Sequence, residues 1–119
     1  SHYHLDNLVA IVDRNRLAIT DFTETMLALE PLEEKWRSFG WETRRCDGHD
    51  IEKLLSCLED VRNRRNGKPL CIIADTVKGK GVDFMENQLN WHGAAPKAEN
   101  IAAAYAALER ERQWNECNS

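Results

Sequence analysis

The sequence lacks several features that would each indicate a particular class of protein. It has no apolar run long enough to cross a bilayer, so we expect no membrane partner. It has no basic excess, because 16 Lys and Arg residues are interleaved with 20 Asp and Glu residues, and this argues against a nucleic-acid partner. It also has no CxxC pair and no secretory leader, so its four scattered cysteines predict reduced thiols and a cytoplasmic protein.

Internal repeats, low-complexity tracts and Pro/Ser-rich linkers are missing as well. A chain of 119 residues without such boundaries predicts one domain over 1–119, which can bury roughly two-thirds of its unfolded surface. His2 and His4 sit at the very start of the chain, and we assign them no role.

Three segments have the composition of strands. Unbroken apolar residues in 5–13 predict a central parallel strand that is covered on both faces. The segment 41–48 alternates in polarity, as is typical of a strand nearer an edge. The segment 68–76 is again apolar on both faces.

Three further segments have the periodicity of amphipathic helices, and the strands alternate with them. They are 31–40, 50–65 and 98–114, with a proline at the start of the first and Asp50 placed to cap the second. The expected buried stripes are Leu32, Trp36 and Phe39, then Ile51, Leu54, Leu55, Leu58 and Val61, then Ile101, Tyr105 and Leu108. The sequence therefore predicts an α/β fold, a three-layer parallel sheet with helices on both faces.

Two connections, 14–30 and 77–97, are much longer than the usual 2–6 residues or so. Both follow the carboxyl ends of predicted strands, where open parallel sheets bind their ligands. We therefore expect function to reside in these two segments, with mobile surface loops as the alternative.

The first connection carries oxygen donors suited to a hard cation. The side chain of Asn15 and the backbone carbonyl of Leu17 are neutral ligands for magnesium or calcium. Such a site needs an anion, and Asp13, still inside the strand, is expected to point elsewhere. A turn or capping role for Asn15 is the alternative.

The second connection begins with the residues KGKG. Gly79 and Gly81 permit close backbone approach or a positive φ angle, and Lys78 and Lys80 add positive charge, a combination suited to phosphate. Further on, His92 can hydrogen-bond to a phosphate or shuttle a proton.

Two other interpretations concern histidines. His92 follows Trp91 directly and could simply pack against its ring. His49 lies in an Asp/Gly-rich turn before a predicted helix, and we assign it a turn role.

Five blocks in order resemble the transketolases, above all the separate amino-terminal subunit of two-chain transketolases. They are DNLVAIVDRNRLAIT, LEPLEEKWRSFGWE, DGHDIEKL, GKPLCIIADTVKGKGVDFMEN and WHGAAP. The resemblance covers about 5–108 and implies the later part of a thiamine-diphosphate-binding (PP-type) module. It implies transfer of a two-carbon ketol unit between sugar phosphates of the pentose phosphate pathway.

The resemblance also implies roles for residues of the first connection. Asn15 and the Leu17 carbonyl would be ligands of Mg²⁺ or Ca²⁺, which holds the diphosphate. Ile19 would lie against the cofactor rings.

In the second connection, Lys78 and Gly79 would fall where the family's loop passes the cofactor. His92 would reach the diphosphate and the reacting end of the substrate, as a hydrogen-bond donor or proton shuttle. It is the predicted catalytic residue.

The sequence departs from the family pattern in ways that imply partner chains. The family's Gly-Asp-Gly segment and its activating glutamate have no counterpart here, and Ala18 and Ala94 replace residues that are often polar in relatives. We therefore expect weak cofactor binding and no turnover by this polypeptide alone. The implied partners are an upstream chain carrying Gly-Asp-Gly and a carboxyl-terminal transketolase chain, which together form a higher-order dimer.

Several alternatives stay open. The chain could be a truncation product or gene fragment rather than a natural subunit. It could be a non-catalytic scaffold or interaction subunit that retains the fold. It could also belong to a related enzyme that makes deoxyxylulose phosphate or dihydroxyacetone with the same cofactor module.

Overall fold

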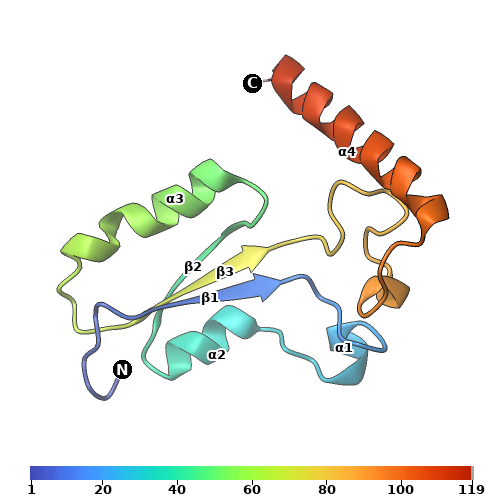
Figure 1. Cartoon of the computed structure of the whole chain (residues 1–119). Helices are drawn as coiled ribbons and strands as arrows, with labels where there is room; N and C mark the ends of the chain where they lie inside the picture. Colours follow the sequence, from blue (N-terminus) through green and yellow to red (C-terminus); the bar gives the residue numbers. More distant parts are fainter. Residues whose placement is uncertain (119) are drawn as a thin grey trace. The chain divides into compact units, whose positions relative to one another are not determined.

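The computed structural model describes residues 1–118 of the chain, which divide into two compact units (Figure 1). The first unit comprises Ser1–Arg16 and Thr23–Thr76, and the second comprises Leu17–Phe22 and Val77–Ser119. The organisation of 1–119 as a single domain stays a prediction.

The first unit is built on a parallel sheet of three strands, β1 (Val9–Arg14), β2 (Glu42–Asp47) and β3 (Leu70–Asp75), in the order β1-β3-β2. This confirms the predicted α/β fold class. The central strand is β3, whose residues Leu70 to Ile73 are fully buried. Such burial on both faces follows from its unbroken apolar run Leu-Cys-Ile-Ile-Ala.

The prediction that 5–13 forms the central strand is wrong for the described chain. Within residues 1–118, β1 pairs with β3 alone, and Ile11 is 56% exposed. An apolar run predicts that a strand is buried. It does not predict which strands pair with it, and therefore does not show whether the strand lies at the centre or at the edge of the sheet. The prediction that 41–48 lies nearer an edge is confirmed by β2.

The register brings the carboxyl ends of all three strands level. Arg14 of β1 pairs with Asp75 of β3, and Asp75 pairs with Asp47 of β2. At the carboxyl edge of the sheet, β1 therefore ends in an arginine, whereas β2 and β3 end in aspartates.

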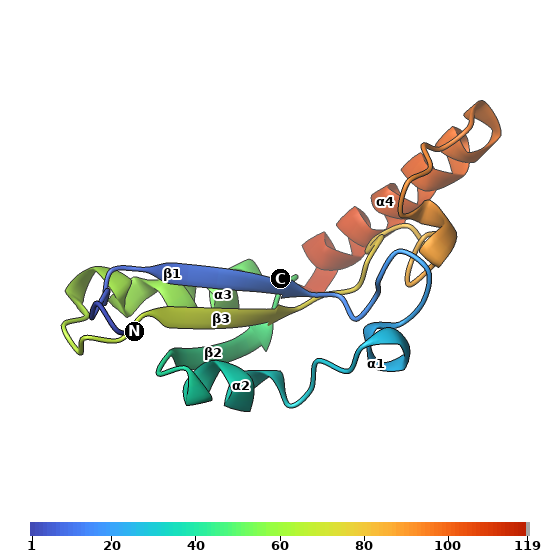
Figure 2. The same cartoon turned by 90° about the horizontal axis from the view of Figure 1, so that it is seen from below.

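Helices α2 (Leu32–Ser38) and α3 (Ile51–Glu59) lie on opposite faces of this sheet (Figures 1 and 2). The connection through α2 runs from β1 outward to β2, and the connection through α3 runs back from β2 to β3. Because both crossovers are expected to be right-handed, travel in opposite directions places their helices on opposite faces.

Helix starts agree with the predicted caps in part. The carboxylate of Asp50 accepts a hydrogen bond from the backbone N–H of Lys53 at 3.0 Å, which confirms Asp50 as the cap of α3. Helix α2 begins one residue after Pro31, and the side chain of Glu30 accepts the N–H of Leu32 at 3.0 Å. A short 3₁₀ segment, η1 (Asp60–Asn63), follows α3, where a continuous helix was predicted.

The predicted buried stripes are only partly buried. In α3, Leu54 and Cys57 are half-buried, whereas Ile51 and Leu55 are 65% and 56% exposed. The sequence contains two neighbouring apolar stripes, and periodicity alone merged them into one face. Phe39 lies beyond the end of α2 and is 74% exposed.

The long connections contain short elements. Helix α1 (Thr23–Met26) belongs to the first unit, and the 17–22 segment of the second unit is closed by a bridge between Leu17 and Phe22. The second unit also contains the 3₁₀ turn η2 (Leu89–Trp91) and the helix α4 (Ala98–Asn118).

The predicted inner stripe of α4 is wrong. Ile101, Tyr105 and Leu108 are all exposed, and among the described residues of the second unit the buried apolar ones are Val82 and Ala107. An alanine-rich helix presents a shallow surface on every side, so the large residues do not mark its covered face. No helix within residues 1–118 has the length and apolar character needed to span a membrane.

Candidate functional site

The structure places the six predicted site residues in two groups. Asn15 is half-buried in the first unit and follows Arg14, the last residue of β1. The remaining residues belong to the second unit and are Leu17, Ile19, Lys78, Gly79 and His92. The Leu17–Phe22 bridge closes the tight loop that carries Leu17 and Ile19.

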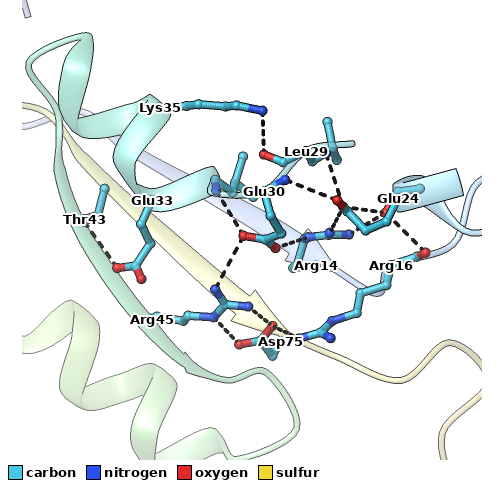
Figure 3. A network of polar contacts seen from close by, with 12 residues as sticks. Arg14, Arg16, Glu24, Leu29, Glu30, Glu33, Lys35, Thr43, Arg45 and Asp75 are labelled. Carbon is cyan, nitrogen blue, oxygen red and sulfur yellow. Dashed lines mark hydrogen bonds and ion pairs between the residues drawn. The ribbon is translucent and has the colours of Figure 1, made fainter. Parts of the chain in front are cut away.

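Arg14, the residue before Asn15, is buried and donates hydrogen bonds to Thr23, Glu24 and Glu30, of which the two glutamates are labelled in Figure 3. Its side chain is 3% exposed. The guanidinium donates to Glu24 Oε1 at 2.6 Å, to Thr23 Oγ1 at 2.9 Å and to Glu30 Oε1 at 3.2 Å. A buried guanidinium whose N–H groups meet two carboxylates and a hydroxyl is compensated for its lost hydration.

The two glutamates also hold the backbone ahead of α2. Glu24 accepts hydrogen bonds from the N–H groups of Leu29 and Glu30, at 3.2 and 3.5 Å. Burial would raise the pKa of Glu24, but these backbone hydrogen bonds and the charge of Arg14 together lower it. The pKa of Glu30 is also lowered, first by the hydrogen bond from Leu32 and then by Arg14.

A second ion pair lies at the carboxyl edge of the sheet. Arg45 of β2 donates two hydrogen bonds to Asp75 of β3, at 2.6 and 2.7 Å, in the forked geometry that suits a carboxylate. The pKa of Asp75 is lowered, first by these hydrogen bonds and then by the charge of Arg45 and of Arg16. Arg16 approaches Asp75 at 3.7 Å.

These contacts bear on whether the first unit could complete a cation site. Asp13 accepts a hydrogen bond from the hydroxyl of Thr76, and Asp75 is held by two arginines. Within residues 1–118, no group of three or more His, Cys, Asp or Glu side chains is placed to hold a metal ion. The side-chain oxygen of Asn15 and the backbone carbonyl of Leu17 are neutral donors of the kind that magnesium accepts, and a magnesium site also needs anionic ligands to balance its charge.

In the second unit, Lys78 organises the loop before His92. Its ammonium donates to the backbone carbonyl of Trp91 at 3.2 Å, and its own carbonyl accepts the N–H of Asn87 at 2.9 Å. The Trp91 indole donates to the carbonyl of Phe84 at 3.1 Å. The 77–97 segment, predicted as a long functional connection with a mobile loop as the alternative, contains hydrogen bonds that span up to 13 residues.

Both glycines of KGKG have positive φ angles, +76° at Gly79 and +91° at Gly81. A Cβ atom at Gly79 would lie 2.6 Å from the carbonyl oxygen of Met85, so the close approach is within the loop itself. The ammonium of Lys80 lies 3.6 Å from Glu86 and 3.5 Å from Glu111, and the charge of Glu111 raises its pKa. The positive charge that suggested phosphate binding at Lys80 is therefore paired within the chain.

His92 ends the η2 turn and is exposed. Its backbone N–H donates to the carbonyl of Leu89 at 2.9 Å. The ring of Trp91 packs against Phe84, with centroids 5.6 Å apart. An exposed imidazole on a turn held by neighbouring residues is accessible to a ligand.

Sequence reasoning missed Arg14. With Arg64, it is one of the two buried charged residues of the described chain. The sequence does contain a pattern that could have indicated a buried ion pair. Arg14 ends an apolar strand, and three acidic residues follow it within 16 positions: Asp21, Glu24 and Glu30.

A parallel α/β sheet with organised loops after its strands places this chain in the open-sheet α/β class, whose members bind ligands at the carboxyl ends of the strands. The chain belongs to the transketolase family, because residues 1–115 match its thiamine diphosphate binding domain.

Curated relatives agree. The chain is 40% identical over 111 residues to an apulose-4-phosphate transketolase subunit of Actinobacillus succinogenes, in an alignment that covers 93% of this chain and 40% of the relative. It is 42% identical over 107 residues to the 6-deoxy-6-sulfo-D-fructose transketolase subunit of a Clostridium species, covering 90% of this chain and 38% of the relative. The chain thus spans about two-fifths of the length of these relatives.

Solved structures show the same fold. The transketolase of Campylobacter jejuni superposes with a TM-score of 0.79 at 29% identity, covering 91% of this chain and 17% of that one. The transketolase of Pichia stipitis gives a TM-score of 0.74 at 22% identity, over 97% of this chain and 21% of that one. The second similarity concerns the fold alone.

Proposed function

We propose that this chain is the thiamine-diphosphate-binding component of a split transketolase, which transfers a two-carbon ketol unit between sugar phosphates. The observation that carries this proposal is the position of Asn15, at the carboxyl end of β1, in a chain whose residues 1–115 match the family's cofactor-binding domain. The carboxyl edge of a parallel sheet is where such folds bind ligands.

Different residues of the chain would contact the metal ion, the cofactor rings and the second loop. The Asn15 side chain and the Leu17 carbonyl supply neutral oxygens to a Mg²⁺ or Ca²⁺ ion that binds the diphosphate. Ile19, 69% exposed, offers an apolar surface to the cofactor rings. Gly79 allows the second loop to pack closely against its own Met85 carbonyl, and Lys78 holds that loop in place where it would pass the cofactor.

His92 would act at the reacting end of the substrate. Its exposed imidazole donates a hydrogen bond to the diphosphate or moves a proton to or from a substrate hydroxyl. Thiamine diphosphate, when bound, supplies the nucleophilic carbon that carries the two-carbon unit. The protein therefore orients the cofactor and handles protons.

Partner chains would complete the site. The carboxylates Asp13 and Asp75 are engaged by Thr76 and by arginines, so the anionic ligand must come from another segment. We propose an upstream chain carrying Gly-Asp-Gly and a carboxyl-terminal transketolase chain, assembled as a higher-order dimer. Free thiols at all four cysteines suit a reducing, cytoplasmic setting for this assembly.

The test is reconstitution. The chain is mixed with the carboxyl-terminal chain of a two-chain transketolase, a peptide or chain carrying Gly-Asp-Gly, thiamine diphosphate and Mg²⁺, and ketol transfer is assayed. We expect transfer that falls at least about a hundredfold in His92→Ala and in Asn15→Ala. Matched controls are His49→Ala in a turn and Asn63→Ala in η1, which should retain activity.

A different outcome would identify a scaffold. If the chains form a stable complex in which no ketol transfer occurs with any sugar phosphate tested, the catalytic proposal is wrong and an interaction subunit is the better account. Transfer that is unchanged in both Ala variants would contradict the assigned residues.

A further inference from the structure

The two arginines on either side of Asn15 are the two ends of one polar network (Figure 3). Starting from one neighbour and ending at the other, successive ion pairs join Arg14, Glu30, Arg45, Asp75 and Arg16. The network links the ends of all three strands to the start of α2. Arg14 and Arg16, at the two ends of this series of ion pairs, are also joined through the backbone of Asn15, which lies between them in the sequence.

The Arg14 end of the network is the strong one. Its guanidinium is 3% exposed and lies 2.6 Å from Glu24, whereas the Arg16 side chain is 62% exposed and lies 3.7 Å from Asp75. Exposed ion pairs contribute little, and removing a partner from a buried charge is costly because the remaining charge lacks hydration. Arg14 therefore dominates the restraint on Asn15.

Arg14 also holds the base of the loop that follows. Residues 17–22 leave the first unit after Arg16 and return at Thr23, and the Thr23 N–H donates to the Arg16 carbonyl at 2.9 Å. The Thr23 hydroxyl meets both the Arg16 carbonyl, at 3.3 Å, and Arg14 Nη1, at 2.9 Å. One guanidinium thus restrains both the outgoing and the returning segments of the chain.

The backbone at this point needs such a restraint. Arg16 has a φ of +64°, a left-handed conformation that residues with a Cβ rarely adopt and that persists only where the surroundings enforce it. The hydrogen bonds from the buried Arg14 guanidinium to Thr23 and Glu24 lie beside this turn, and the Thr23 hydroxyl joins Arg14 to the Arg16 carbonyl. These hydrogen bonds therefore restrain the backbone on both sides of Asn15.

We propose that Arg14 is a positioning residue for Asn15: by tying the end of β1 to Thr23, Glu24 and Glu30, it fixes the backbone from which the Asn15 side chain would reach the cation. This inference rests on the proposed cofactor role of Asn15. Arg14 itself touches no reacting group. Its forked guanidinium is the feature required, because a single ammonium cannot reach a hydroxyl and two carboxylates in this geometry.

The test follows amide hydrogen exchange in the full chain by NMR. In Arg14→Gln we expect the Thr23 amide to exchange at least about tenfold faster, since a hydrogen bond to a buried charge is lost. The Ile72 amide of the central strand should keep its protection. Arg14→Lys, which keeps the charge and serves if the Gln variant fails to fold, should give an intermediate acceleration.

The matched control is Arg64→Gln, which removes the other buried arginine, bonded to Glu42 at 2.8 Å and far along the chain from the loop. It should leave the ratio of Thr23 to Ile72 exchange unchanged. If Arg14→Gln accelerates Thr23 and Ile72 by the same factor, or accelerates neither, Arg14 supports only general stability and the proposal is wrong. Wild-type exchange in Arg14→Lys would also overturn it.

A second readout separates this inference from the proposed function. In the reconstituted complex, the Mg²⁺ concentration that half-saturates thiamine diphosphate binding should rise at least about tenfold in Arg14→Lys and stay unchanged in Arg64→Gln. Equal values for Arg14→Lys and wild type would overturn the positioning role while leaving the cofactor site intact. If the wild-type complex binds no cofactor, the proposed function fails and the role of Arg14 in it fails too, whatever the exchange data show.

Discussion

The ammonium of Lys78 donates a hydrogen bond to the backbone carbonyl of Trp91, 3.2 Å away and 13 residues along the chain. The residue expected to face a phosphate is therefore engaged with the segment that presents His92. Lys78 and His92 are coupled through one backbone carbonyl.

This coupling predicts the effect of Lys78→Met. Loss of the hydrogen bond should cost about 1 kcal/mol locally, so the His92 amide, which donates to Leu89, should exchange about fivefold faster. Amide exchange measured by NMR tests this directly. Lys97→Met, an exposed lysine of the same unit, is the control and should leave the His92 amide unchanged. Unchanged exchange at His92 in Lys78→Met would contradict the coupling.

The turn at Arg16 predicts a stabilising substitution. Because Arg16 has a φ of +64°, Arg16→Gly should relieve backbone strain and raise the free energy of unfolding by a few tenths to about 1 kcal/mol, after the extra entropy of glycine in the unfolded chain. Urea denaturation measures the change. Arg16→Ala is the control, since it also removes the approach to Asp75 but keeps a Cβ atom, and it should not stabilise. A lower free energy of unfolding in the glycine variant would show that the Asp75 contact matters more than the strain.

The Arg45–Asp75 pair predicts how stability depends on acid. The folded pKa of Asp75 lies below its ordinary value, so the unfolded chain takes up the proton more readily. The stabilisation is complete above the unfolded pKa of about 3.9 and is lost as the pH falls below it, through the lower folded pKa. Urea midpoints measured between about pH 2.5 and 6 should therefore fall less steeply below about pH 4 in Asp75→Asn than in wild type.

The control for this pair is Asp83→Asn. Asp83 also meets an arginine, Arg110 at 3.2 Å, but its side chain is 72% exposed and water screens the pair. Its removal should leave the acid dependence as in wild type. The same slope in Asp75→Asn and wild type would mean that the Arg45 hydrogen bonds do not favour the ionised carboxylate in the folded state.

The cysteines predict an order of alkylation. Cys71 is fully buried, and burial raises its pKa to about 11, so at pH 8 only about one thiol in a thousand is ionised. Cys117 is exposed on α4. Iodoacetamide treatment followed by mass spectrometry should label Cys117 at least about a hundredfold faster than Cys71 in the native chain. Comparable alkylation rates of Cys71 and Cys117 in the native chain would contradict the burial of β3.

The sequence allowed the elements and the fold class to be predicted because strand and helix periods are local. The caps were local too, as Asp50 shows. The position of β1 in the sheet and the covered face of α4 depended on which surfaces meet, and Ile11 and Tyr105 gave no local sign of their exposure. Asn15 stood out as an unusual residue in an informative place, whereas Arg14 could be assigned only from partners that folding brings to it.

The most direct test of the central claim, that this chain contributes uncharged oxygens to a cation site completed by other chains, is calorimetric titration of thiamine diphosphate in Mg²⁺. We predict little or no binding to the chain alone, tight Mg²⁺-dependent binding when the two partner chains are present, and loss of that binding in Asn15→Ala. Tight Mg²⁺-dependent binding to the isolated chain, or full binding by the Asn15→Ala complex, would contradict the account.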